Sequence, residues 1–84
     1  MKRAEVYDSL LELAKTLFDR VEVSAGDFQG GACKVRGESC LFINKTAGLD
    51  TNLKLLASTL SGMNLEERYL LPAVRDAIEQ YNER

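Results

Sequence analysis

Histidine is absent from this chain, and its absence removes the base on which most nucleophilic and general acid-base sites depend. Ser58, Thr59 and Ser61 supply hydroxyl groups, but no imidazole is available to accept their protons. Glu66 and Glu67 are adjacent carboxylates, yet a catalytic pair needs an enclosing pocket to hold one acid protonated, and a chain this short has little material for one. We therefore expect no catalytic residue, no cofactor and no enzyme.

Long apolar runs are missing as well. No stretch approaches the roughly 20 apolar residues of a membrane span. Charged residues between Met1 and Asp8 interrupt anything that resembles the apolar core of a signal peptide. We therefore expect a cytoplasmic protein with no membrane partner. Two cysteines in a chain without an export signal agree with a reducing compartment and free thiols.

The chain is too short for a second domain, because its 84 residues, 45% of them hydrophobic, suffice for one modest core. Residues 1–84 are therefore expected to form a single α+β domain. A domain of this size buries only about 60% of the surface that its unfolded chain exposes. Self-association as a homodimer, or contact with a protein partner, would add to that burial.

Basic charge is sparse and local. The net charge is −2, and between residues 32 and 48 Lys34, Arg36 and Lys45 face only one acidic residue, Glu38. Proteins that bind nucleic acid carry a broad basic face. A patch this small is typical of solvated surface, so we expect no nucleic-acid partner.

Three segments show the three- and four-residue apolar periodicity of helices. The first covers residues 3–18. A second helix is expected to have Asp50 or Thr51 as its N-cap and to end at Gly62 in a left-handed conformation. Pro72 suits the first turn of a final helix. The apolar stripes expected for the three helices are Val6, Leu10, Ala14 and Leu17 together with Tyr7, Leu11 and Phe18; Leu53, Leu56, Ala57 and Leu60; and Val74, Ala77, Ile78 and Tyr81.

Between the first two helices the pattern changes to that of short strands. Residues 21–24 alternate with period two, and residues 32–36 and 40–44 form two further short runs. Gly37 lies between these two runs and can adopt the positive φ of a tight hairpin turn. Three antiparallel strands in a meander are the economical arrangement. The expected fold is therefore α+β, with an N-terminal helix, a three-stranded antiparallel meander and two C-terminal helices packed on the sheet.

The third strand is apolar on both of its faces. Leu41 and Ile43 point to one side, whereas Cys40 and Phe42 point to the other. Either the helices wrap this strand within one chain, or a second copy supplies the cover. The strand therefore predicts an interaction module that self-associates or binds a protein partner. The expected interaction surface comprises Lys34, Arg36, Leu41, Phe42, Ile43 and Lys45.

Cys33 and Cys40 lie on either side of the hairpin turn, with six residues between them. This is not the two-residue spacing of thioredoxin-like motifs or zinc knuckles, and two thiolates cannot complete a structural zinc site. We expect no metal site in one chain, although two chains could supply four thiolates.

The length of the hairpin loop decides whether the two cysteines can meet. A two- or four-residue loop puts both on one face, where a reversible disulfide can form, and a three-residue loop puts them on opposite faces. Two interpretations stay open. Both cysteines are small buried hydrophobes, or Cys33 and Cys40 serve a thiol-based redox or metal-responsive role.

The run from Gly30 to Gly37 reads Gly-Gly-x-Cys-x-x-Arg-Gly, and it is followed by the strand Phe42-Ile43-Asn44-Lys45 and the helix Leu55-Leu56-Ala57-x-x-Leu60. Together with residues 69–75, these motifs resemble a family of small uncharacterised bacterial proteins. The resemblance implies a bacterial, cytoplasmic protein and supplies no activity.

The hairpin and the helix after it are also similar to the core of small zinc metallopeptidases that cleave phage repressors. In those enzymes the helix carries His-Glu-x-x-His, in which two imidazoles bind zinc and the glutamate activates water. The aligned positions in this chain are Ser58, Thr59, Leu60, Ser61 and Gly62. Every catalytic group is replaced, so the similarity implies at most a groove beside Ser58 and Ser61 that binds peptide without cleaving it.

Overall fold

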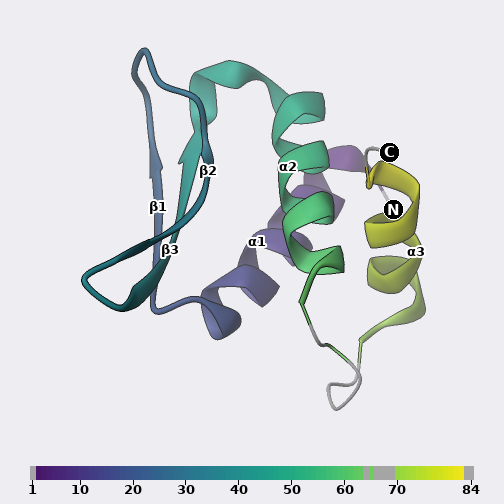
Figure 1. Ribbon diagram of the computed structural model, residues 1–84. Helices are drawn as coiled ribbons and strands as arrows, with labels where there is room; N and C mark the ends of the chain where they lie inside the picture. The colour runs from purple at the N-terminus through teal and green to yellow at the C-terminus, as the bar shows by residue number, and fades with distance from the viewer. Residues whose placement is uncertain (1, 64, 66–69, 83–84) are drawn as a thin grey trace.

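The described part of the chain forms three α-helices and a three-stranded sheet, which confirms the expected α+β class. The computed structural model describes residues 2–63, 65 and 70–82, so Glu66 and Glu67 lie outside the described residues. Pro72 lies in the first turn of the last helix, as predicted. The elements in Figure 1 are α1 (Arg3–Leu17), β1 (Arg20–Ser24), β2 (Gly31–Val35), β3 (Glu38–Asn44), the 3-10 turn η1 (Lys45–Ala47), α2 (Leu49–Ser61) and α3 (Pro72–Tyr81).

The sheet is mixed, which corrects the expected antiparallel meander. Its strand order is β1-β3-β2, and β3 pairs with β1 in parallel and with β2 antiparallel. After β1 the chain does not form a tight turn. Residues 25–30 instead cross the end of β3 and bring β2 to the opposite edge of the sheet (Figure 1). The most buried strand thereby lies in the centre, and the more exposed strands β1 and β2 lie at the edges.

Hydrogen bonds between Asp19 and Ser39 link the N-terminal ends of β1 and β3. The backbone N–H of Ser39 donates to the Asp19 carboxylate at 2.9 Å, and the backbone N–H of Asp19 donates to the Ser39 hydroxyl at 3.0 Å. These reciprocal bonds hold the two strands in parallel with Val21 opposite Leu41. As a result, the helix-facing side chains of both strands contribute to one core.

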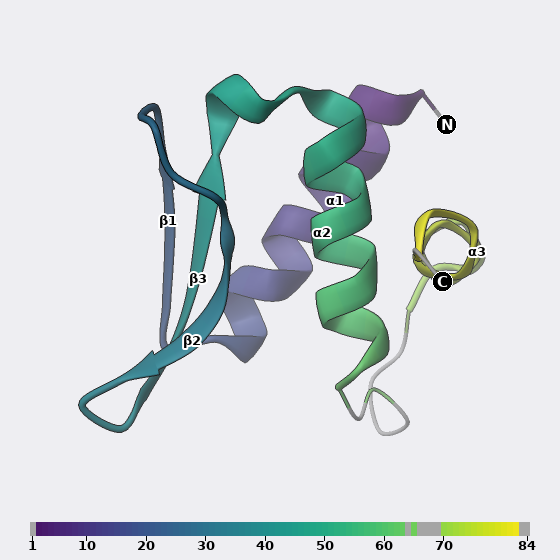
Figure 2. The same cartoon turned by 45° about the horizontal axis from the view of Figure 1, so that its top comes forward.

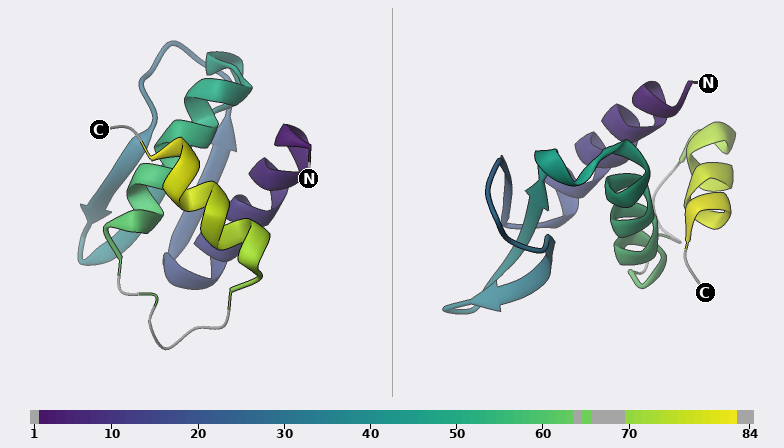
Figure 3. Two further views of the ribbon diagram at one scale, coloured as in Figure 1. Left: turned by 90° about the vertical axis from the view of Figure 1, so that its right-hand side faces the viewer. Right: turned by 90° about the horizontal axis from the view of Figure 1, so that it is seen from above.

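The helices form two layers on one side of the sheet. α1 and α2 lie next to the sheet, and α3 lies beyond them (Figure 2). The view from above in Figure 3 shows the same order. α3 therefore packs on other helices rather than on the sheet, which corrects the expected arrangement. The core joins both helix layers to one face of the sheet, and its buried members are Val6, Leu10, Ala14, Leu41, Ile43, Leu53, Leu56, Leu60, Leu70, Val74, Ala77 and Ile78.

Both ends of α2 differ from the expectation. The helix starts directly after Gly48, whose φ of 96° requires glycine, so Asp50 and Thr51 lie in the first turn rather than at the N-cap. The Asp50 carboxylate instead pairs with the guanidinium of Arg3 and joins the start of α2 to α1. At the other end Gly62 has φ −82° and ψ −2°, which is right-handed rather than left-handed.

Candidate functional site

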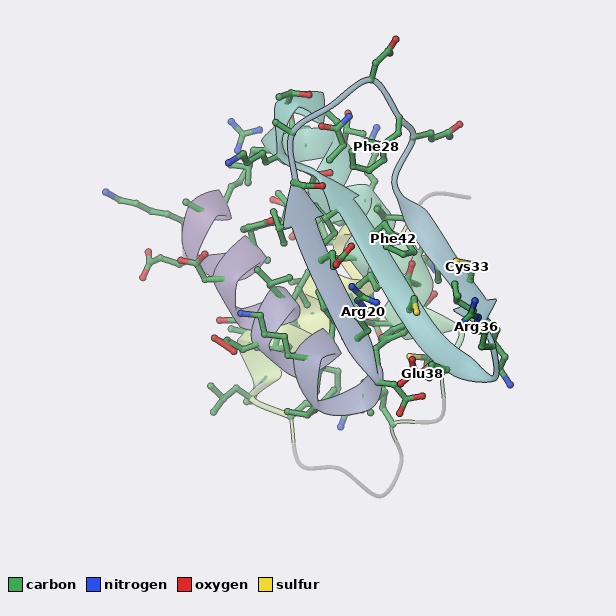
Figure 4. All side chains as sticks on the ribbon, turned by 90° about the vertical axis from the view of Figure 1, so that its left-hand side faces the viewer. Arg20, Phe28, Cys33, Arg36, Glu38 and Phe42 are labelled. Atoms are coloured by element: carbon green, nitrogen blue, oxygen red, sulfur yellow. The ribbon has the colours of Figure 1, made fainter. Side chains whose placement is uncertain are left out.

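The side of the sheet that faces away from the helices carries Cys33 and several charged side chains (Figure 4), and the strand register places Cys40 beside Cys33. Side chains alternate along a strand, and Leu41 and Ile43 enter the core. Their neighbours Cys40 and Phe42 therefore point away from the helices. We define the outer face as Arg20, Glu22, Gly31, Cys33, Val35, Glu38, Cys40 and Phe42.

The strand register arranges the outer face in rows. Arg20, Cys40 and Cys33 lie side by side across β1, β3 and β2. The next row contains Glu22 on β1, Phe42 on β3 and, on β2, a glycine at position 31. In the described part of the chain, no atom outside residues 30–32 lies within 4 Å of the place where a β-carbon of that glycine would be. The Phe42 ring consequently has open space on the β2 side.

Arg20, on the edge strand β1, is the cation of the outer face. Its Nη2 atom lies 2.7 Å from Oε1 of Glu22. The hydrogen bond to Glu22 raises the pKa of Arg20, with smaller increases from the charge of Glu22 and from Cys40 and Glu38 on β3. The arginine is therefore a permanent positive charge that acts on the central strand as well as on its own.

The two cysteines face each other across β2 and β3, because Cys33 is the register partner of Cys40. Both thiols are free. Cys33 is exposed, whereas Cys40 is only 2% exposed, and the Cys40 thiol contacts the Glu38 carbonyl oxygen at 3.7 Å. The hairpin loop has two residues, Arg36 and Gly37. This is one of the two loop lengths expected to place both cysteines on one face, and both lie on the outer face.

The apolar residues of the expected interaction surface lie on two sides of the sheet. Leu41 and Ile43 are fully buried against the helices, so they are absent from the surface. Phe42 lies between them in sequence and on the outer face in space (Figure 4). Period-two alternation predicted this division, but it did not tell which side the helices cover.

The three basic residues of that expected surface are also separated. Lys34 pairs with Ser39 in the register and thus lies on the helix-facing side of β2. Arg36 lies in the hairpin turn, and Lys45 lies at the other end of β3 in η1. They therefore do not form one patch.

Two buried asparagines that the sequence analysis did not single out lie at the end of β3, where Asn44 contacts the loop of residues 25–30 and Asn52 contacts Asn44. The Asn44 amide nitrogen donates to the carbonyl oxygens of Gly26 at 2.8 Å and Phe28 at 2.7 Å. Its amide oxygen accepts from the backbone N–H and the hydroxyl of Thr46. Asn52 of α2 donates to the Asn44 carbonyl oxygen. The sequence pattern that could have indicated this role is a single asparagine among apolar residues, Asn44 in a strand and Asn52 in a helix.

Three surface depressions lie away from the outer face. One of about 530 Å³ lies between the loop of residues 25–30 and the first turns of α2, and it is lined in part by Phe28, Thr51 and Leu55. A second of about 390 Å³ lies between α1 and α3. Ser61 lines a third of about 250 Å³, but its hydroxyl donates to the Ser58 carbonyl oxygen at 2.9 Å. The Ser61 hydroxyl therefore forms its hydrogen bond within α2.

The described residues contain no group of three or more cysteine, aspartate or glutamate side chains that could hold a metal ion. Within the same part of the chain, no helix has the length and apolar character needed to cross a membrane. Comparison with protein-family models, with curated proteins and with solved structures gives no match to this chain. The outer face therefore has to be interpreted from its own geometry.

Proposed function

We propose that this protein is a non-enzymatic interaction module that binds a second copy of itself through the outer face of its sheet. The proposal rests on the two faces of the central strand, β3. Leu41 and Ile43 are covered by helices, whereas Phe42 on the opposite side has no described helix over it. Val35, at the turn end of the same face, is 45% exposed. Covering these groups would remove apolar surface from water.

The charges of the outer face favour a second copy as the occupant. Arg20 and Glu22 lie on β1, and Glu38 lies beside the hairpin turn, where Arg36 adds a second cation. Charges of both signs therefore lie on or beside the outer face. In a two-fold symmetric dimer the same patch meets itself, so unlike charges of the two copies can pair. A partner with one strong charge would leave half of these groups facing a like charge.

The proposal of a non-enzymatic role rests on residue chemistry. Without histidine, a nucleophile here lacks its usual base. The hydroxyls of Ser58 and Ser61 donate to helix carbonyl oxygens at 3.1 Å and 2.9 Å. These two serines support α2 rather than a reaction.

Sedimentation of Val35→Lys against Leu71→Lys tests the proposed interface. Both positions hold exposed aliphatic residues, but Val35 lies on the outer face, and Leu71 precedes α3 on the far side of the molecule. Lysine at position 35 would lie opposite Glu38, so the hairpin should tolerate it. We expect the wild type to sediment as two chains at micromolar concentration. Val35→Lys should weaken association at least roughly tenfold, because it places a charge in an apolar contact.

The matched variant Leu71→Lys should sediment like the wild type. A wild-type protein with the mass of one chain at every concentration would contradict self-association. Equal weakening by both variants would place the interface elsewhere.

A further inference from the structure

The hairpin turn holds the two cysteines in a fixed register. Arg36 and Gly37 have φ values of 52° and 84°, and positive φ at both central residues is the signature of a two-residue type I′ turn. Val35 then pairs with Glu38, and two positions further Cys33 pairs with Cys40. No other pairing satisfies this turn. The two thiols are therefore neighbours on the outer face through backbone geometry.

The separation of Cys33 and Cys40 allows a disulfide bond, but this bond would be strained. Counted from the turn, Cys33 and Cys40 occupy a hydrogen-bonded pair, in which the Cα atoms lie about 5.5 Å apart. This separation is within the usual range for disulfides. Cβ atoms of directly opposed residues lie about 4.5 to 5.5 Å apart, whereas a disulfide prefers about 3.8 Å. Closing the bond must pull the strands together, and strained disulfides are easily reduced.

The two thiols differ in access to solvent. Cys33 is exposed on the edge strand β2 and can meet a dissolved reagent. Cys40 lies on the central strand, between Arg20 and Cys33, and is 2% exposed. A reagent therefore reaches Cys33 first, and Cys40 reacts next with whatever forms on Cys33.

We propose that Cys33 and Cys40 form a reversible thiol switch that hydroperoxides oxidise. The Cys33 thiolate attacks one oxygen of the hydroperoxide, the O–O bond breaks, and the leaving oxygen takes a proton and departs as water or an alcohol. Cys33 is then a sulfenic acid. The Cys40 sulfur attacks the Cys33 sulfur, and the sulfenic hydroxyl leaves as water with the Cys40 proton. Two thiols have lost two electrons and two protons, and the hydroperoxide has gained them. A dithiol reductant reverses the change by thiol–disulfide exchange.

Oxidation of the full-length protein with hydrogen peroxide tests the switch, with intact mass measured under denaturing, non-reducing conditions after iodoacetamide treatment. The wild type should lose two hydrogen atoms, take up no iodoacetamide and keep the mass of one chain. Dithiothreitol should restore both thiols. In Cys40→Ser, dimedone should label a sulfenic acid at Cys33. In Cys33→Ser, the remaining thiol should react roughly tenfold more slowly than Cys33, because it is buried.

Two results would overturn the proposal. One is a wild-type product that joins two chains through Cys33. The other is a sulfinic acid on Cys33 while Cys40 stays free. Both results are read at a protein concentration at which sedimentation of the reduced protein gives the mass of one chain, because a dimer through the outer face would cover Cys33. Circular dichroism of each serine variant shows whether the fold is retained.

Discussion

Gly30 lies where the loop of residues 25–30 returns to the sheet, and there is no room for a side chain at this position. A β-carbon on Gly30 would lie 2.7 Å from the Phe42 carbonyl oxygen and 3.1 Å from a methyl group of Leu55. A β-carbon on the next residue, Gly31, would meet no atom of the other described residues within 4 Å, apart from its neighbours in the chain. The adjacent glycines therefore have different roles, although the sequence presents them as a pair.

Alanine at each glycine in turn separates these roles. Gly30→Ala should lower the free energy of unfolding by about 2 kcal/mol, because the backbone of β3 must move to admit the methyl group. Gly31→Ala should leave it unchanged or raise it by about 0.5 kcal/mol, because the variant loses less entropy on folding. Urea denaturation measures both values. Equal losses in the two variants would show that flexibility, rather than close approach, requires glycine here.

Among the elements, the connection from β1 to β2 depends on a single side chain. Asn44 donates to two loop carbonyl oxygens and accepts two hydrogen bonds from Thr46, so its amide is fully used. It is 7% exposed. A buried carbonyl oxygen that loses its donor costs free energy comparable to a hydrogen bond or more. The mixed topology is thus stabilised where the loop crosses the end of β3.

Asn44→Asp should destabilise the protein by about 3 kcal/mol at neutral pH, because a carboxylate would face two carbonyl oxygens. Repulsion and burial raise the pKa of the new carboxyl group in the folded state above its unfolded value of about 3.9. The folded state then binds the proton more tightly, so stability should recover as the pH falls through this folded pKa.

The control is Asn44→Ala, which also removes the donor but cannot titrate. Urea denaturation at pH 4 and pH 7 measures the comparison. The same pH dependence in both variants would contradict the assigned role of the amide.

The helices and strands also show which features the sequence patterns could predict and which they could not. Period-two alternation predicted β3 and its two apolar faces, and the helical stripes of all three helices are confirmed, with Leu17 and Tyr81 at the periphery of the core. The pairing of β1 was predicted wrongly, because strand order depends on long-range contacts such as the one between Asp19 and Ser39, which are 20 residues apart. Local periodicity contains no information about such contacts.

For the whole molecule, the dimer and the thiol switch make a joint prediction that depends on both proposals. A second copy on the outer face would cover Cys33 along with Phe42 and Val35. The rate of Cys33 alkylation by iodoacetamide should therefore fall as protein concentration rises, by roughly tenfold once dimers dominate. Val35→Lys should remove this concentration dependence. Dimers in sedimentation together with a constant alkylation rate would place the interface on another face.

The order of apolar and polar residues was enough to determine the helices, the hairpin and the α+β class, because periodicity and turn chemistry act over a few neighbouring residues. The absence of histidine likewise limited the available chemistry before any fold was known. Two features came from long-range packing alone: the parallel pairing of β1 and the side of β3 that the helices cover. Each depends on which distant surfaces meet when the core excludes water, and that is a property of the folded chain as a whole.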